Sequence, residues 1–192
     1  MKITDQVYLV GGAGFGYSAP GDCNVYLVDG GGALALIDTG GGLGAGDILG
    51  NVRRMGLDPA KITVAFNTHC HFDHIGGNSD IKKATGCRIL AHEADRNSME
   101  ALDELSLYTM ADERGISFEA VPVDETVRDG EIVQVGSASL KVVHTPGHTP
   151  GCFSLVLIEK DGKTSVFCGD IAGANGRLGY INGPGFDLSD WK

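Results

Sequence analysis

The stretch NTHCHFDHIGG, residues 67–77, places three of the chain's six histidines and an aspartate within six positions. It overlaps the end of ITVAFNT (62–68), an apolar run that predicts a buried strand. Side chains alternate in an extended segment, so His69 and His71 project to one side while Cys70 faces the other. Two imidazoles with this spacing suit one metal ion. Asp73 and His74 are consecutive and diverge, so we expect them to serve a second ion.

A different interpretation makes these residues polar members of a loop, with Asp73 capping a helix that begins near Ile75. That interpretation suits any one of the histidines alone. It suits the four residues together poorly, because crowded imidazoles and a carboxylate without a cation leave unsatisfied polar groups. We therefore interpret the stretch as part of a metal site.

Two later segments can complete such a site. HTPGHTPG (144–151) brackets His148 with two Pro-Gly pairs, whose restricted backbone can aim an imidazole outward. VFCGD (166–170) ends an apolar strand on Asp170, at the position where strand-end residues of α/β proteins face a ligand cleft. Considered alone, Asp170 is more typical of a turn.

Composition predicts one globular domain over residues 1–192. The chain is 42% hydrophobic with a mean hydropathy of +0.01, which is enough to bury a core. A net charge of −10 disfavours nucleic acid and anionic membrane surfaces as partners. Neither a signal peptide nor an apolar run of about 18 residues is recognisable, so we expect a cytoplasmic protein. The five scattered cysteines suit reduced thiols.

Hydrophobic patterning predicts a mixture of strands and helices. A helix is expected within AGDILGNVRRMGLDP (45–59), another in 77–85, and a long helical region from about 93 to 114. The expected strands are 7–10, 24–29, 33–38, 62–68 and 88–92, followed by strands near 131–135, 139–144, 153–158 and 164–169. Because helices lie between strands, the fold class is α/β with mixed sheets.

An internal echo predicts two similar halves. VYLVDGGGALALID and SLVLIEKDGKTSVFCGD each consist of a strand, a turn and a strand, and they end on Asp38 and Asp170. A helix, a strand and His69 follow Asp38. No equivalent helix, strand and histidine follow Asp170 before Lys192, so we expect the second half to be incomplete.

The motifs THCHFDHIGG, TPGHTPG, CGD and LIDTGG together resemble those of the metallo-β-lactamase superfamily, in its glyoxalase II-like hydrolase branch. The resemblance covers essentially the whole chain and implies an αββα sandwich of two mixed sheets flanked by helices. It implies ligands for two metals: His69, His71 and His148 at the first, Asp73 and His74 at the second, and Asp170 bridging them. It also implies that Asp38 steadies the histidine cluster.

One departure from the family concerns the second metal. Family members take a further ligand from a histidine near the C-terminus, and no histidine follows His148 in this sequence. We expect either a truncated chain or a second site that binds its metal loosely. His92 is a candidate replacement, although a strand-end histidine is more typical of a structural role. We expect His144 to be structural as well.

The expected ligands are those of a zinc-dependent hydrolase with one or two Zn²⁺ ions, and iron or manganese are the alternatives. Such a cation lowers the pKa of bound water from 15.7 toward ~7, so hydroxide forms at neutral pH without a protein nucleophile. Asp73 is the expected catalytic residue, because it can orient this hydroxide toward a carbonyl. No Ser-His-Asp or Cys-His arrangement competes.

The expected substrate is a small molecule with a thioester, lactone or ester carbonyl, because His74 follows Asp73 as in glyoxalase-like members. β-Lactam hydrolysis is the nearest alternative, since HxHxDH also occurs in one lactamase subclass. A catalytically impaired metal-binding fragment is the non-enzyme alternative. The diiron oxygen reductases of the superfamily carry Glu at the position of His71, which disfavours redox chemistry. A homo-oligomer is a further alternative, because the apolar region 93–118 can pack on another subunit.

Overall fold

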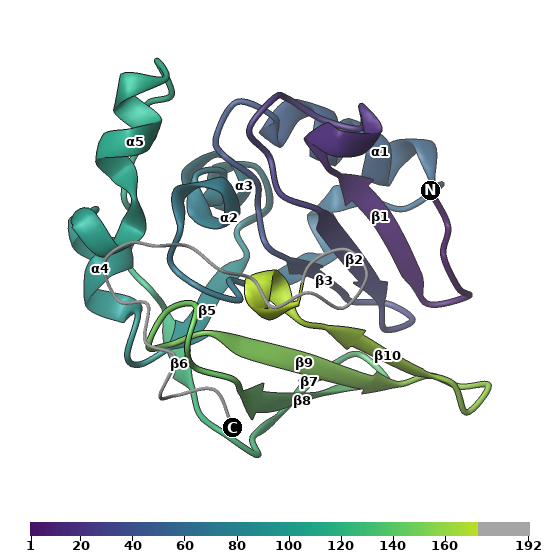
Figure 1. Cartoon of the computed structure of the whole chain (residues 1–192). Helices are drawn as coiled ribbons and strands as arrows, with labels where there is room; N and C mark the ends of the chain where they lie inside the picture. The colour runs from purple at the N-terminus through teal and green to yellow at the C-terminus, as the bar shows by residue number, and fades with distance from the viewer. Residues whose placement is uncertain (173–192) are drawn as a thin grey trace.

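Two β-sheets pack face to face in the computed structural model, which describes residues 1–172 (Figure 1). The first sheet has the strand order β1-β2-β3-β4-β5-β6: β1 (Val7–Gly11), β2 (Val25–Asp29), β3 (Leu34–Ile37), β4 (Ile62–Phe66), β5 (Arg88–His92) and β6 (Glu125–Val127). The second sheet has the order β10-β9-β8-β7: β7 (Ile132–Val135), β8 (Ala138–His144), β9 (Phe153–Ile158) and β10 (Thr164–Phe167). The α/β sandwich predicted from the sequence is confirmed.

The first sheet combines hairpins with crossovers. β1, β2 and β3 are antiparallel neighbours, whereas β3, β4, β5 and β6 are parallel neighbours. Parallel neighbours need a connection that returns the chain to the end of the sheet where the first strand began. A helix usually provides this connection. Helix α1 (Ala45–Arg54) joins β3 to β4, and α3 (Asn78–Thr85) lies between β4 and β5.

Strand β3 illustrates why these strands are apolar throughout. Leu34 and Leu36 pack in the layer between the first sheet and the helices, together with Ile48 of α1. Ala35 and Ile37 pack in the layer between the two sheets. Because successive side chains of a strand point to opposite faces, a strand in contact with both layers buries every residue.

The region expected to be helical over 93–114 consists of three short segments. Left-handed backbone at Leu102 and Leu107, with φ of 51° and 57°, separates them. The Asp103 side chain accepts hydrogen bonds from the N–H groups of Leu105 and Ser106, which starts a new turn in place of a continued helix. The segments are α4 (Arg96–Ala101), the 3₁₀ helix η3 (Glu104–Ser106) and α5 (Tyr108–Glu113).

The second sheet repeats the hairpin of the first half. β9 and β10 form an antiparallel hairpin as β2 and β3 do, and Asp38 and Asp170 follow the two hairpins. Helices α1 and α3 lie on the side of the first sheet away from the second sheet (Figure 1). On the outer face of the second sheet, Ile132, Ile158 and Val166 are 58%, 73% and 57% exposed.

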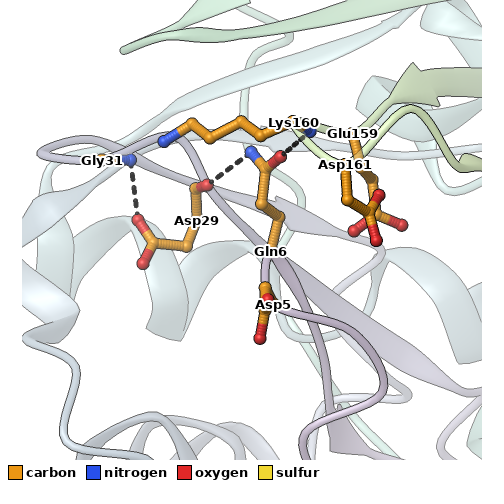
Figure 2. A pocket seen from close by; sticks show the side chains of 7 residues that line it. All are labelled: Asp5, Gln6, Asp29, Gly31, Glu159, Lys160 and Asp161. Atoms are coloured by element: carbon orange, nitrogen blue, oxygen red, sulfur yellow. Dashed lines mark hydrogen bonds between the residues drawn. The ribbon is translucent and has the colours of Figure 1, made fainter.

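Gln6 joins the two sheets at the ends of these hairpins (Figure 2). Its amide nitrogen donates to the carbonyl of Asp29 at 3.2 Å, and its amide oxygen accepts from the N–H of Lys160 at 2.7 Å. The side chain is buried beside a cavity of about 370 Å³ that is mainly lined by acidic residues. A buried amide bonded at both ends fixes one sheet relative to the other.

The remaining features bear on sequence predictions. All five cysteines are free thiols, as their spacing predicted; three are buried, and Cys23 and Cys168 are half-buried. Within residues 1–172, the helices are all too short or too polar to cross a bilayer. The other short helical elements are η1 (Ala13–Phe15), η2 (Pro59–Lys61), α2 (Phe72–Ile75) and η4 (Gly169–Ile171).

Candidate metal centre

The chain leaving β4 carries the histidine stretch along the interface of the two sheets. The N–H of Asn67 donates to the carbonyl of Leu90 at 2.8 Å, and the N–H of Phe153 donates to the carbonyl of Thr68 at 3.0 Å. The backbone of 67–68 is therefore bonded to both sheets, and residues 67–71 are all buried. The histidines that follow are held by this rigid frame.

Three imidazoles meet beside this segment, and we call the place the tri-histidine position (His69, His71 and His148). The ring centroids lie 4.5–4.7 Å apart, and the rings are inclined at 70–82° to one another. Each residue is at most 2% exposed, and their ligand atoms all lie within 4.8 Å of one another. Cys70 turns the other way, with its thiol toward the carbonyl of Leu105, as strand alternation predicted.

Asp95 holds the loop of His148 against the histidine stretch. Its carboxylate accepts from the Thr149 hydroxyl at 2.6 Å, from the N–H of Gly151 at 2.6 Å and from the N–H of Cys70 at 3.0 Å. A Cβ atom on residue 151 would lie 2.5 Å from the Asp95 carboxyl carbon, so glycine permits this contact. The sequence analysis missed Asp95, because the residues next to it in the sequence do not indicate that it joins the histidine stretch to the loop of His148.

Asp38 orients His74. One of its oxygens lies 2.9 Å from Nδ1 of His74, and the carboxylate also accepts from the N–H of Thr68 at 2.8 Å and from its hydroxyl at 2.9 Å. An imidazole that is bonded through Nδ1 binds a metal through its other nitrogen, Nε2. The contact matches the role that the family resemblance implied for Asp38.

Two carboxylates face Nε2 of His74, and we call this the mixed position (Asp73, His74 and Asp170). Oxygens of Asp73 and Asp170 lie 3.5 and 3.3 Å from that nitrogen. Asp170 also approaches Nε2 of His148 at 3.8 Å, so it lies between the two positions. Asp73 does not cap a helix, since neither α2 nor α3 has a side-chain cap.

Gly169 allows Asp170 to approach the cluster. Its φ is +51°, in the left-handed region, and a Cβ atom there would lie 2.7 Å from the hydroxyl oxygen of Thr68. The turn η4 can therefore pack against the histidine stretch. The sequence predicted Asp170 at the end of a strand, and the structure places it in this turn, three residues after β10 ends at Phe167.

Burial keeps the rings of His69 and His71 neutral. It lowers the pKa of His69 well below its usual range, and the nearby imidazoles lower it further. Burial, with His148 and His74, lowers the pKa of His71 to about 3, although Asp170 opposes the shift. A proton on either ring would be poorly solvated and would face other rings. Both rings are therefore in the form that binds a cation.

The mixed position has the opposite electrostatics. Burial alone lowers the pKa of His74, but Cys23 and the carboxylates of Asp38, Asp73 and Asp170 raise it well above its usual range. Burial alone raises the pKa of Asp170, but the close contact with His74 and the other imidazoles hold it at about 2. Burial raises the pKa of Asp73. Without a cation, this position therefore carries a proton on His74 that a cation must replace.

Cys23 lies at the edge of the mixed position. Its thiol, a carboxylate oxygen of Asp38 and a ring nitrogen of His74 form a group of ligand atoms within 4.8 Å of one another. Burial raises the pKa of the thiol to about 12. Sequence reasoning treated the cysteines only as buried thiols. Cys23 and Asp73 are 50 positions apart, and nothing in the sequence signals that they lie close together.

A cavity of about 700 Å³ opens beside the mixed position. Asp38, Asp73, His74 and Asp170 line one part of it. The part with apolar and aromatic side chains contains Ile3, Val7, Tyr26, Ile37, Val166 and Phe167. A small molecule with a polar reacting group and an apolar substituent fits such a lining.

His92 and His144 form a pair of their own. Their rings stack 4.0 Å apart at an angle of 7°, and Nε2 of His144 lies 2.9 Å from the carbonyl oxygen of Pro150. Nδ1 of His92 accepts from the N–H of Ala94 at 3.3 Å. Neither belongs to the residue groups that could hold an ion within the described part of the chain. The structural role expected for both agrees with this geometry.

The residues present fit a divalent cation. Nε2 of His69 and Nε2 of His74 are buried and make no hydrogen bond within residues 1–172. Buried ring nitrogens are normally bonded, so two such atoms beside carboxylates need a partner. His69, His74 and Asp170 form a further group of ligand atoms within 4.8 Å, which connects the two positions.

Comparison with known proteins identifies relatives that are hydrolases. The chain is 35% identical over 109 residues to a hydroxyacylglutathione hydrolase of Rhodospirillum rubrum, covering 57% of this chain and 33% of that protein. It is 32% identical over 151 residues to the hydroxyacylglutathione hydrolase of Methylococcus capsulatus, covering 78% of this chain and 47% of that protein. The chain thus spans between a third and a half of the length of these two relatives.

Solved structures share the fold. A metallo-β-lactamase mutant from Cronobacter sakazakii matches with a TM-score of 0.76 and 28% identity, over 95% of this chain and 67% of that one. BJP-1, a subclass B3 metallo-β-lactamase of Bradyrhizobium japonicum, matches with a TM-score of 0.75 and 31% identity over the same shares. The family model of the metallo-beta-lactamase superfamily matches residues 18–191. The chain therefore belongs to the metallo-beta-lactamase superfamily.

Proposed function

We propose that this chain is a zinc-dependent hydrolase that cleaves a thioester, lactone or ester carbonyl of a small molecule. The observation that carries the proposal is the convergence of His69, His71 and His148, with ligand atoms within 4.8 Å of one another, beside the carboxylates of the mixed position. The hydroxyacylglutathione hydrolases among the relatives favour a thioester.

The proposal assigns each cation to a set of residues by the donor atoms that those residues carry. In the proposal, His69, His71 and His148 hold one Zn²⁺, Asp73 and His74 contribute to a second position, and Asp170 bridges the two. Neutral imidazoles are the common ligands of zinc, while the carboxylates also suit iron or manganese. The bridging role of Asp170 is supported by its distances of 3.3 Å to His74 and 3.8 Å to His148.

A bound divalent cation supplies acidity to water and polarises a carbonyl oxygen. The chain's own residues supply the rest of the chemistry. Asp73 is the proposed catalytic residue: it lines the cavity beside the histidine cluster, where its carboxylate would orient the attacking water toward the carbonyl. Cys70 is no competing nucleophile, since it is fully buried and faces Leu105.

The cavity supports a small carbonyl compound as the substrate. Ile3, Tyr26 and Phe167 offer an apolar surface for an acyl substituent, next to the carboxylates of Asp73 and Asp170. An acidic site within a chain of net charge −10 disfavours a polyanion, so nucleic acid is not proposed as a partner.

β-Lactam hydrolysis is the second candidate. The observation that favours it is the match to metallo-β-lactamase structures at 28% and 31% identity. Both candidates require attack on a carbonyl, and they differ in the leaving group, which is a thiolate or alkoxide in one case and an amide nitrogen in the other.

The test is a substrate screen with controlled zinc. Chelator-treated protein is reloaded with zinc and assayed with an acyl-glutathione thioester, a γ-lactone, an aryl ester and a cephalosporin. We expect turnover of a thioester, lactone or ester that chelation abolishes and zinc restores. Turnover of the cephalosporin alone would establish the second candidate. Stoichiometric zinc without turnover of any substrate would reduce the chain to a metal-binding fragment and refute the proposal.

A further inference from the structure

Cys23 is fixed next to the mixed position by its backbone. It precedes β2, and its N–H donates to the carbonyl of Asp73 at 3.2 Å. Asp73 and Cys23 are thus held together although they are 50 positions apart in the chain. The same segment that presents the Asp73 carboxylate therefore also determines where the thiol lies.

The thiol lies beside His74, whose Nε2 faces the carboxylates of Asp73 and Asp170. Of the three ligand atoms grouped within 4.8 Å, the carboxylate of Asp38 is already bonded to Thr68 and to Nδ1 of His74. Nε2 of His74 is buried, in a residue that is 2% exposed, and makes no hydrogen bond within the described residues. Cys23 and His74 line the same cavity as Asp73 and Asp170.

We propose that Cys23 is a thiolate ligand of the cation that His74 holds at the mixed position. This inference rests on the metal centre of the proposed function. Sulfur and imidazole nitrogen are both common donors to zinc, and the thiol of Cys23 lies within 4.8 Å of a ring nitrogen of His74. The thiol proton leaves to solvent as the bond from sulfur to the cation forms.

A sulfur donor gives the mixed position a preference among metals. Thiolate favours zinc, cobalt and cadmium, whereas sites of carboxylate and water favour magnesium and manganese. The inference therefore narrows the metals expected at this position, since manganese would gain little from Cys23.

Cys168 provides the matched control. It lines the same cavity and is half-buried like Cys23. Its thiol contacts the carbonyls of Gly169 and Ala172, at 3.7 and 3.8 Å, within its own turn. It belongs to none of the groups of potential ligand atoms within residues 1–172.

The test is titration of the chelator-treated, full 192-residue chain with cobalt(II) alone, followed by absorption spectroscopy. A cobalt–thiolate bond produces a charge-transfer band in the near ultraviolet, which imidazole and carboxylate ligands do not produce. We expect the band to rise as the second cobalt equivalent binds. It should disappear in Cys23→Ser and remain in Cys168→Ser. Cobalt affinity at the second position of Cys23→Ser should fall by at least about 10–100-fold, the loss seen when even a supporting partner of a ligand is removed.

A second measurement does not depend on a variant that folds. In the wild-type chain, X-ray absorption at the cobalt edge should show a sulfur scatterer beside the nitrogen and oxygen scatterers once the second equivalent is bound, and a first shell of nitrogen and oxygen alone would count against the inference. Absence of the band from the wild-type chain, or its persistence in Cys23→Ser, would overturn the inference. Neither readout uses a substrate, so a chain that shows the band without hydrolysis would refute only the proposed function.

Discussion

The tri-histidine position and the mixed position lie side by side but are built differently. The first consists of three buried imidazoles that are inclined at 70–82° to one another. The second combines one buried imidazole with Asp73 and Asp170, whose side chains are 32% and 43% exposed. Preorganised nitrogen donors bind a cation with little rearrangement. We therefore expect tight binding at the first position and weaker binding at the second.

Their supports also differ. Asp95 joins the two backbone segments that carry the tri-histidine ligands, whereas Asp38 contacts the ring of His74 directly. Each position can therefore be weakened by a residue that does not touch the other. The predictions below use this separation.

The largest effect is expected from His71→Ala. Loss of one of three ligands should abolish tight binding of the first cation and activity together, by more than the roughly 10–100-fold that follows loss of a supporting partner. Isothermal titration with zinc and the hydrolysis assay measure the two losses. His144→Ala is the matched control, because His144 stacks on His92 away from the cluster and should retain both properties. Retention of one tightly bound zinc by His71→Ala would contradict the assignment.

Asp95→Ala should weaken the tri-histidine position through its frame. The change leaves the N–H groups of Cys70 and Gly151 and the hydroxyl of Thr149 without their acceptor. The free energy of unfolding should fall by about 3 kcal/mol, measured by urea denaturation. Asp95→Asn retains one oxygen acceptor and should lose about half as much. An unchanged denaturation midpoint in Asp95→Ala would show that the connection carries no stability.

Asp38→Asn should affect the mixed position more than the tri-histidine position, which Asp38 reaches only through Thr68. Asparagine keeps the shape and tolerates the left-handed backbone at this residue, where φ is 61°, but it removes the charge that orients His74. Affinity for the second cation should fall by about 10–100-fold, and affinity for the first cation should fall less. Titration of the variant with two equivalents of zinc separates the two. Equal weakening of both positions would mean that they are not separately supported.

The smallest effect concerns pH. The folded pKa of His71 is about 3, below the unfolded value, so between these two values the unfolded chain binds a proton that the folded chain does not. The stability of the cation-free protein therefore falls as the pH falls. From pH 6 to pH 5, this group should contribute a loss of about 1 kcal/mol, which His71→Gln should remove. Denaturation of both proteins at the two pH values gives the difference, and identical pH dependence would contradict the neutral, buried state of His71.

Much of the fold was predictable because its signals are local. The apolar pattern of LALI (34–37), the hairpin glycines and the echo of the second hairpin all depend on short-range chemistry. The segment 93–114 was not predictable in detail, since left-handed residues such as Leu102 and Leu107 break the helix without glycine or proline. Strand β6, at Glu125–Val127, was also missed because it is short and pairs only with β5.

The candidate site also contains residues that were predictable from the sequence and residues that were not. The alternation of His69 and His71 and the rigid turn around His148 are readable from spacing and turn chemistry, and the structure brings these residues together. Asp95 and Cys23 could not be found, because their importance lies in contacts across tens of residues that no local pattern encodes. Residues that support ligands in three dimensions carry no signature in a single sequence.

Anomalous X-ray diffraction from zinc-containing crystals tests the central claim most directly. The account predicts a strong peak at about 2.0–2.1 Å from one ring nitrogen of each of His69, His71 and His148. A second, weaker peak should lie among the residues of the mixed position. Imidazoles too far apart to share a peak, or zinc bound only elsewhere on the chain, would contradict it.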